Sequence, residues 1–121
     1  MHRLPPALAA TATPQILELL GDGPGRVLEL GFAGIHATPL RLAGFEVTVV
    51  EPDPAYLDRA RERAGDARPS VPHEQFDAVV APDDADLWDI AAGTRVLVGQ
   101  DGSVWSSPPG PTSSKAKGSP I

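Results

Sequence analysis

Residues 26–53 read RVLELGFAGIHATPLRLAGFEVTVVEPD, and this stretch contains the pattern that decides the fold. Residues 26–30 form a short apolar run and residues 45–50 form a run rich in β-branched side chains, so both are predicted strands. Between them, the small-residue turn at 31–34 is followed by a helix predicted over 35–43. A strand, a helix and a second strand in this order predict a parallel pair joined by a right-handed crossover.

Strands continue to alternate with helices on both sides of this stretch. A helix predicted to begin at Thr13 ends at Gly21, and one capped by Asp53 ends near Gly65. The remaining predicted elements are strands at 76–81 and 94–98, a short helix or turn at 83–92 and a return strand at 104–105. A third strand is absent or eroded in residues 66–75, which show no periodicity. The pattern predicts an α/β fold, namely a Rossmann-like three-layer α/β/α sandwich with a mostly parallel sheet.

The chain divides into three parts by composition. Residues 1–12 are predicted to be a flexible leader, and residues 13–105 form the Rossmann-like domain. Residues 106–121 read SSPPGPTSSKAKGSPI, a low-complexity composition that predicts a disordered tail.

Charge and cysteine content exclude several classes of function. The net charge is -6, and both lysines lie in the tail, so the body has no basic face for nucleic acid or for a membrane surface. The chain has no cysteine, which excludes disulfides, thiolate metal sites and a cysteine nucleophile. No two histidines have metal-ligand spacing, and no apolar run approaches the ~20 residues of a membrane span. We therefore expect a cytoplasmic protein without a metal site.

The turn after the first strand and the end of the second strand together predict a ligand. Small residues at 31–34 let the backbone approach a bound molecule closely. Glu51 follows about 20 positions after Gly31, where a carboxylate is placed to accept both hydroxyls of a ribose. The two features predict a nucleoside-containing ligand at the carboxyl ends of the strands.

The same residues resemble the class I S-adenosylmethionine-dependent methyltransferase family. The resemblance rests on VLELG at 27–31 after a GDGPG turn, on VTVVEPDP at 47–54 and on FDAVVA at 76–81. It covers roughly residues 14–100. It implies that the chain binds S-adenosylmethionine and transfers its methyl group to a small-molecule acceptor. Such a transfer depends on orienting the methyl group and needs no acid–base motif.

The resemblance also implies which residues bind the cofactor: Glu29, Gly31, Phe32, Ala33, Gly34, Glu51, Pro52, Asp53 and Asp66. Glu29 is similar to the acid that helps hold the methionine end, and Glu51 matches the ribose-binding acid. Pro52 and Asp53 flank the adenine, and Asp66 loosely resembles the acid that contacts the adenine amino group. No catalytic residue is implied.

The chain departs from the family pattern in its turn and in its length. The family turn is usually G-x-G-x-G. Here either Ala33 and Ile35 replace two glycines, or the turn is one residue short and ends at Gly34. The last two strands of the full fold and the usual substrate-binding insertions have no room. The sheet is therefore expected to be truncated relative to the full methyltransferase fold.

Two other functions remain open at this point. A degenerate, non-catalytic methyltransferase-like module would bind a second copy or a partner protein through the sheet edge left by the missing strands. A nicotinamide- or flavin-binding domain would suit residues 43–51 equally well. Against that class, Glu29 is an unusual charge before a dinucleotide turn, and His36 stands at the third glycine position.

Overall fold

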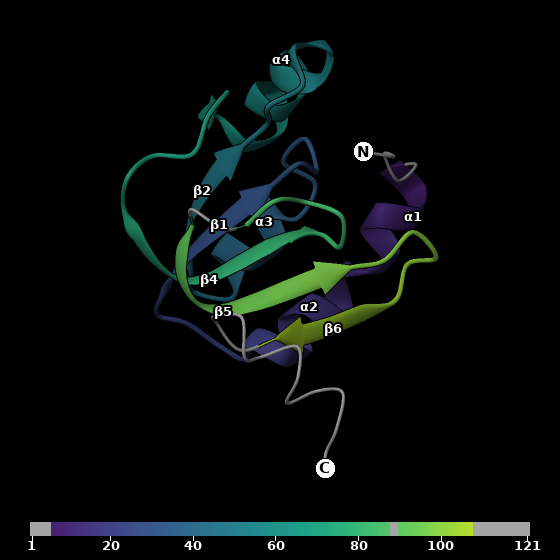
Figure 1. The fold of residues 1–121 in the computed structure, drawn as a ribbon, viewed down its shortest axis with the longest axis vertical. Coiled ribbons are helices and arrows are strands. Elements are labelled where there is room, and N and C mark those ends of the chain that lie inside the picture. Colours follow the sequence, from purple (N-terminus) through teal and green to yellow (C-terminus); the bar gives the residue numbers. More distant parts are fainter. Residues whose placement is uncertain (1–5, 88–89, 108–121) are drawn as a thin grey trace.

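The computed structural model describes residues 6–87 and 90–107, which contain four helices and one six-stranded sheet (Figure 1). The helices are α1 (Pro6–Thr11), α2 (Thr13–Leu20), α3 (Ala37–Leu42) and α4 (Pro54–Ala64). The strands are β1 (Arg26–Leu30), β2 (Glu46–Val50), β3 (Ala67–Arg68), β4 (Gln75–Pro82), β5 (Ala91–Val98) and β6 (Val104–Ser107). None of these helices has the length and apolar composition needed to cross a membrane.

The strands lie in the order β3-β2-β1-β4-β5-β6. The pairs from β3 to β5 are all parallel, and β6 pairs with β5 in the antiparallel direction. The chain moves outward from β1 to β2 and β3, and then returns to the other side of β1 to form β4 and β5. The predicted mostly parallel, Rossmann-like sheet is confirmed. The change of direction lies between β1 and β4, where open α/β sheets bind their ligands.

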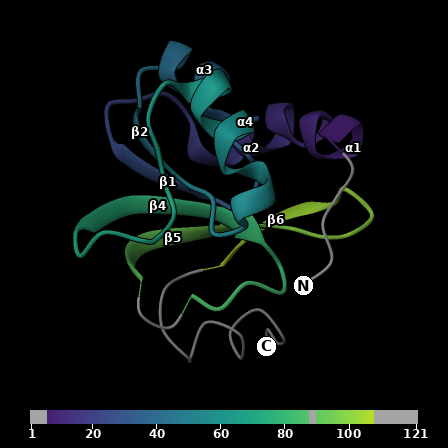
Figure 2. The same ribbon diagram turned by 90° about the horizontal axis from the view of Figure 1, so that it is seen from above.

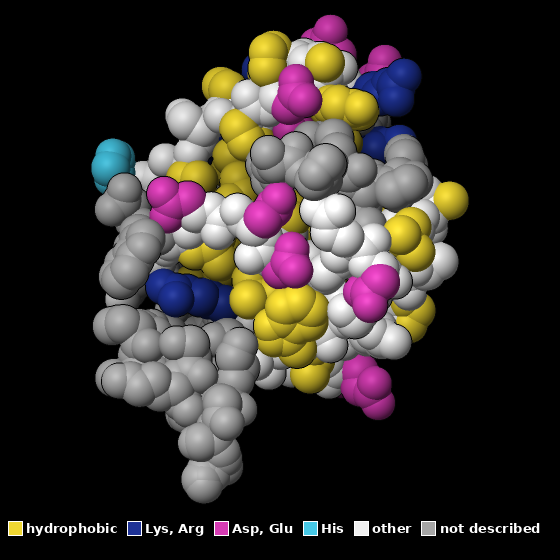
Figure 3. Space-filling model, turned by 45° about the vertical axis from the view of Figure 1, so that its right-hand side comes forward, with side chains coloured by type: hydrophobic (Ala, Val, Ile, Leu, Met, Phe, Trp, Pro, Cys, Tyr) yellow, Lys and Arg dark blue, Asp and Glu magenta, His cyan; other side chains and the backbone are white. Residues whose placement is uncertain are grey.

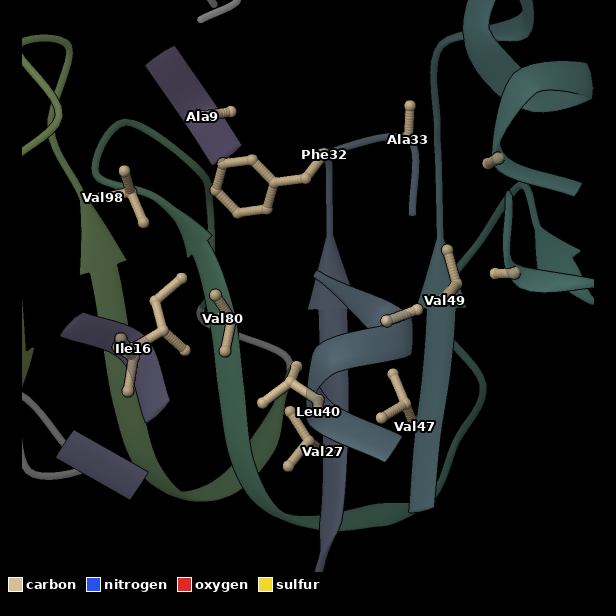
Figure 4. Packing of buried hydrophobic residues seen from close by; sticks show 14 of the residues in the cluster. Ala9, Ile16, Val27, Phe32, Ala33, Leu40, Val47, Val49, Val80 and Val98 are labelled. Atoms are coloured by element: carbon tan, nitrogen blue, oxygen red, sulfur yellow. The ribbon is translucent and has the colours of Figure 1, made fainter. Parts of the chain in front are cut away.

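One face of the sheet is covered by all four helices (Figure 2). Ile16 of α2 and Leu40 of α3 are fully buried and belong to one apolar cluster with Val27 and Val80 of the sheet (Figure 4). Because side chains alternate along a strand, the odd-numbered positions of β1 face these helices and the even-numbered positions face away.

The opposite face carries no helix in the described part of the chain. Its cluster contains Leu28 and Val79 from the sheet, covered by Leu87 and Ile90 from the connection between β4 and β5. That connection spans only residues 83–90, fewer than the dozen or so residues that a parallel crossover normally needs. The connection from β3 to β4, residues 69–74, is shorter still. The described residues of both connections form no helix, so the predicted helical third layer is not present in the described part of the chain.

Most predicted elements are present with shifted ends. The helix predicted from residue 35 begins at Ala37, because residues 31–36 form the turn. The strand predicted at 94–98 begins at Ala91 and takes residues assigned to the helix or turn before it. The eroded third strand is present as the two residues of β3.

The two ends of the chain differ from the sequence prediction where they are described. Residues 6–11 of the predicted leader form α1, and Ala9 and Ala12 lie in the core. Ser106 and Ser107, assigned to the tail, belong to β6. The rest of the predicted tail, residues 108–121, and residues 1–5 of the leader lie outside the described residues.

Candidate functional site

The turn between β1 and α3 has an unusual backbone. Gly31, Ala33 and Gly34 all have positive φ angles, of 82°, 52° and 77°. Ala33 is the only residue other than glycine with a positive φ among those described. A left-handed conformation costs an alanine about 1–2 kcal/mol, so the surroundings must hold this turn in place.

Hydrogen bonds hold the turn on several sides. The amide of Gly31 donates to the carbonyl of Val50 at the end of β2 (2.9 Å). The amide of Ala33 donates to Oε1 of Glu51 (2.9 Å), and the carbonyl of Ala33 accepts from Nη1 of Arg63 on α4 (3.1 Å). The turn is thus hydrogen-bonded both to the end of β2 and to α4.

Glu29 lies under the same turn and is fully buried. Its Oε2 accepts from the amide of His36 (2.7 Å), whereas Oε1 has no hydrogen-bond partner among the described residues. Burial raises the pKa of Glu29 to about 7. The His36 amide and the charges of Arg41 and Arg63 oppose this rise, and the charge of Glu51 adds to it. The carboxyl group is therefore a buried acid that titrates near neutral pH.

His36 joins the turn to the N-terminal helices. Its ring is fully buried, and Nδ1 lies 2.7 Å from the hydroxyl oxygen of Thr13. Burial lowers the pKa of His36 to about 4, so the imidazole is neutral at pH 7. α2 begins at Thr13 as predicted, with Ala12 at its N-cap, and Thr13 uses its hydroxyl for this longer-range contact.

A cavity of about 460 Å³ lies at the carboxyl ends of β1 and β4. Its lining residues come from the ends of β1, β2 and β4 and from the two irregular connections: Leu30, Gly31, Pro52, Val71, Pro72, His73, Pro82, Asp84, Ala85, Asp86 and Ile90. This volume is within the range of small-molecule sites, and most of the lining is apolar. The cavity lies at the point where the strand order changes direction.

The predicted site residues are placed in three ways. Gly31 and Pro52 line the cavity. Five others are not in its lining: Glu29, Phe32, Ala33, Gly34 and Glu51 are all buried beneath or within the turn. The ring of Phe32 points toward Ala9 of α1 (Figure 4). Asp53 caps α4 through the amide of Ala55, and Asp66 is exposed and is not part of the lining. The assignment of these residues to a cofactor remains a prediction.

The sequence did not identify the cavity residues of the two connections. Val71, Pro72 and His73 lie in the stretch without periodicity, and Asp84 and Asp86 lie in the segment predicted as a short helix or turn at 83–92. The signal that could have found these residues was the length of the two connections. A parallel crossover of fewer than about a dozen residues does not hold the usual helix and leaves space above the strand ends. No group of three or more His, Cys, Asp or Glu in the described ranges is placed to hold a metal ion.

Gly34 is required for packing of the turn on α4. A Cβ at this position would lie 3.2 Å from the carbonyl oxygen of Ala60, and its φ is 77°. Gly34→Ala is expected to lower the free energy of unfolding by about 1–3 kcal/mol in urea titrations. Gly65→Ala is the matched control, because Gly65 has a φ of 84° and no atom near its Cβ position. Equal losses in the two variants would show that the contact with α4 contributes nothing.

Comparisons with known proteins match the chain in structure only. No family model and no curated protein matches the sequence significantly. A candidate RNA methyltransferase from Pyrococcus horikoshii, PH1948, has a TM-score of 0.56 at 18% identity, over 75% of this chain and 57% of its own. The glycopeptide N-methyltransferase MtfA has a TM-score of 0.55 at 19% identity, over 74% of this chain and 52% of its own.

A third structure agrees with these two. A candidate S-adenosyl-L-methionine-dependent methyltransferase from Methanococcus maripaludis has a TM-score of 0.55 at 13% identity, over 80% of this chain and 57% of its own. The chain thus spans little more than half the length of the methyltransferases that it matches. Its strand order, its turn after β1 and these likenesses agree: the chain has the class I S-adenosylmethionine-dependent methyltransferase fold, in a shortened form.

Proposed function

We propose that this chain binds S-adenosylmethionine in the cavity at the ends of β1 and β4, and that it transfers the methyl group to a small-molecule acceptor. The observation that carries this proposal is the position of the cavity. It lies at the switch point of the sheet, with Gly31 of the turn on one side and Pro52, after the second strand, on another. That is where an α/β sheet of this order binds a nucleoside ligand.

The residues around the cavity fit such a cofactor in size and in charge. S-adenosylmethionine carries a sulfonium and an ammonium group, and when bound it supplies an electrophilic methyl group. Asp84 and Asp86 line the cavity, and among the described residues no Lys or Arg is part of its lining. Glu29 is fully buried and is not part of the lining, so it does not contribute to the charge of the cavity.

Charge also favours a small-molecule acceptor over nucleic acid. The net charge is -6, and acidic side chains are spread over the face shown in Figure 3. Binding of a phosphate backbone requires a cluster of Lys and Arg, since displaced counterions drive that association. In this proposal the walls of the cavity, Pro52, Val71 and Pro82, orient the cofactor and exclude water from it.

Calorimetric titration with S-adenosylmethionine tests the proposal, with its demethylated product and NAD as further ligands. We expect saturable binding of the first two and none of NAD. Ala85→Trp places an indole in the cavity and should abolish binding, whereas Ala55→Trp, on the exposed start of α4, should leave it unchanged. Absence of binding to folded wild-type protein, or equal loss in both variants, would overturn the proposal.

The second candidate is a non-catalytic module that binds protein through its sheet edge. Among the described residues, β6 is the last strand of the sheet and pairs with β5 alone. An unpaired strand edge can add a strand from another chain. A folded protein that binds no cofactor but forms dimers in sedimentation experiments would favour this function.

A further inference from the structure

The carboxylate of Glu51 is already occupied by two different segments of the chain. Oε1 accepts from the amide of Ala33 in the turn after β1 (2.9 Å). Oε2 accepts from the amide of Asp53 in the turn after β2 (3.0 Å). The side chain is 0% exposed and is absent from the cavity lining. The carboxylate therefore faces the two turns and not the cavity in this structure.

The contact with Ala33 maintains a strained conformation. Ala33 has a φ of 52°, which an alanine adopts only when its surroundings enforce it. Glu51 binds the amide of this residue, and Nη1 of Arg63 binds its carbonyl (3.1 Å). Together the two contacts bind the backbone N–H and the backbone carbonyl of Ala33.

The contact with Asp53 positions the start of α4. Asp53 is the N-cap of this helix, and its Oδ1 accepts from the amide of Ala55 (2.9 Å). Pro52, which lies between Glu51 and Asp53, lines the cavity, as does Gly31 of the other turn. One buried carboxylate therefore connects the two segments that supply these cavity walls.

We propose that Glu51 is a positioning residue, a buried clamp that holds the turn at 31–34 and the start of α4 in register. It replaces, in this chain, the direct ribose contact that the sequence predicted for Glu51. The clamp sets the positions of Gly31 and Pro52 and acts on a ligand only through them. Two experiments test the clamp. The ligand-binding experiment rests on the proposed function, whereas the hydrogen-exchange experiment does not.

Hydrogen exchange of Glu51→Gln, measured by NMR without ligand, tests the clamp directly. Glutamine keeps one acceptor but directs an NH2 group at the second amide, so one of the two hydrogen bonds is lost. At least one of the amides of Ala33 and Asp53 should exchange about tenfold faster or more, relative to the amide of Val79 in β4, because its hydrogen bond to the side chain of residue 51 is removed. Unchanged relative exchange at both amides would overturn the clamp.

Arg63→Met provides a second hydrogen-exchange test of the clamp if Glu51→Gln does not fold. This variant removes the contact to the carbonyl of Ala33 and leaves Glu51 intact. With the clamp in place, the amide of Ala33 stays protected in Arg63→Met, since Glu51 still accepts from it. If the amide of Ala33 in Arg63→Met exchanges as fast as exposed amides do, Glu51 does not hold the turn.

Ligand discrimination separates the clamp from a ribose contact. The probes are adenosine and 2′,3′-dideoxyadenosine, which differ only in the ribose hydroxyls. A clamp predicts that Glu51→Gln weakens both by the same factor and leaves their affinity ratio unchanged. A direct ribose contact predicts that wild-type protein binds adenosine more tightly than 2′,3′-dideoxyadenosine, and that Glu51→Gln loses this preference. If wild-type protein binds neither probe, the proposed cofactor site fails, while the exchange experiment still decides the clamp.

A second substitution should rescue the variant if the clamp acts through Ala33. Glycine adopts a φ of 52° without strain, so Ala33→Gly in the Glu51→Gln background should restore part of the lost probe affinity. Ala60→Gly, at a buried position within α4, is the matched control and should restore none. Equal rescue by both substitutions, or none by Ala33→Gly, would contradict the mechanism.

Discussion

The unfolding free energy of Glu29→Gln, taken relative to that of wild type, is expected to increase by about 2–3 kcal/mol between pH 5 and pH 8. The folded-state pKa of Glu29 is about 7, above the ordinary value of 4.5. The folded protein therefore binds a proton that the unfolded chain releases. The resulting stability is complete below the unfolded pKa and is lost as the pH rises through the folded pKa. Glutamine has no such proton to lose.

His36 changes stability in the opposite direction over part of this range. Its pKa is lowered from 6.5 to about 4, so the unfolded chain takes up a proton that the folded protein does not. Stability from this group is present above pH 6.5 and is lost as the pH falls toward 4. Between pH 5 and pH 7 the two groups nearly cancel in wild type. Glu29→Gln should therefore reveal the loss of stability toward acid pH that His36 causes.

Urea titrations of both proteins at pH 5, 6.5 and 8 provide the measurement. The quantity of interest is the difference in unfolding free energy between variant and wild type, because constant effects of the new amide group cancel when pH values are compared. A difference that does not change with pH would mean that Glu29 titrates as an ordinary exposed acid, and would refute its burial in the folded protein.

Leu40→Ala is expected to lower the free energy of unfolding by about 2–5 kcal/mol. Leu40 is 0% exposed and joins α3 to the sheet beside Val27 (Figure 4). Its truncation removes apolar contact and leaves a cavity that a close-packed core fills only in part. Because α3 directly follows the turn, the same variant should also weaken ligand binding at the cavity.

Leu42→Ala is the matched control, in the same helix and with the same chemical change. Leu42 is 84% exposed, so its substitution should change stability by no more than about 0.5 kcal/mol. Leucine and alanine have similar helix propensities, so the contrast between the two variants reports burial. Comparable losses at both positions, measured by thermal unfolding, would contradict the placement of α3.

Local signals in the sequence were sufficient for the elements that carry strong patterns. The apolar runs of β1, β2 and β4 and the Asp-Pro start of α4 predicted these elements within a few residues. The glycine turn was visible because left-handed positions favour small residues, and Gly31 and Gly34 indeed have positive φ angles. The order of these elements then implied a parallel sheet, since crossovers in such sheets have one handedness.

The surroundings of Glu51 and Glu29 could not be inferred in the same way. Both acids follow apolar strand residues, and a sequence shows only that each lies at or near a strand end. Their burial depends on contacts with Ala33, Asp53 and His36, which meet them only after the two turns have packed together. The same pattern is thus compatible with a ligand-facing acid and with an internal clamp.

The sequence by itself determined the order of β1, α3, β2, α4, β4 and β5, the glycine turn and the acidic, cysteine-free body, because each depends on local composition and periodicity. Only the tertiary structure decided which face of the sheet the described helices cover, where the cavity lies and which acids are buried. The physical reason is the length of residues 69–74 and 83–90. Connections shorter than the usual dozen residues do not hold a full crossover helix, and the space that they leave above the strand ends depends on the packing of the whole domain.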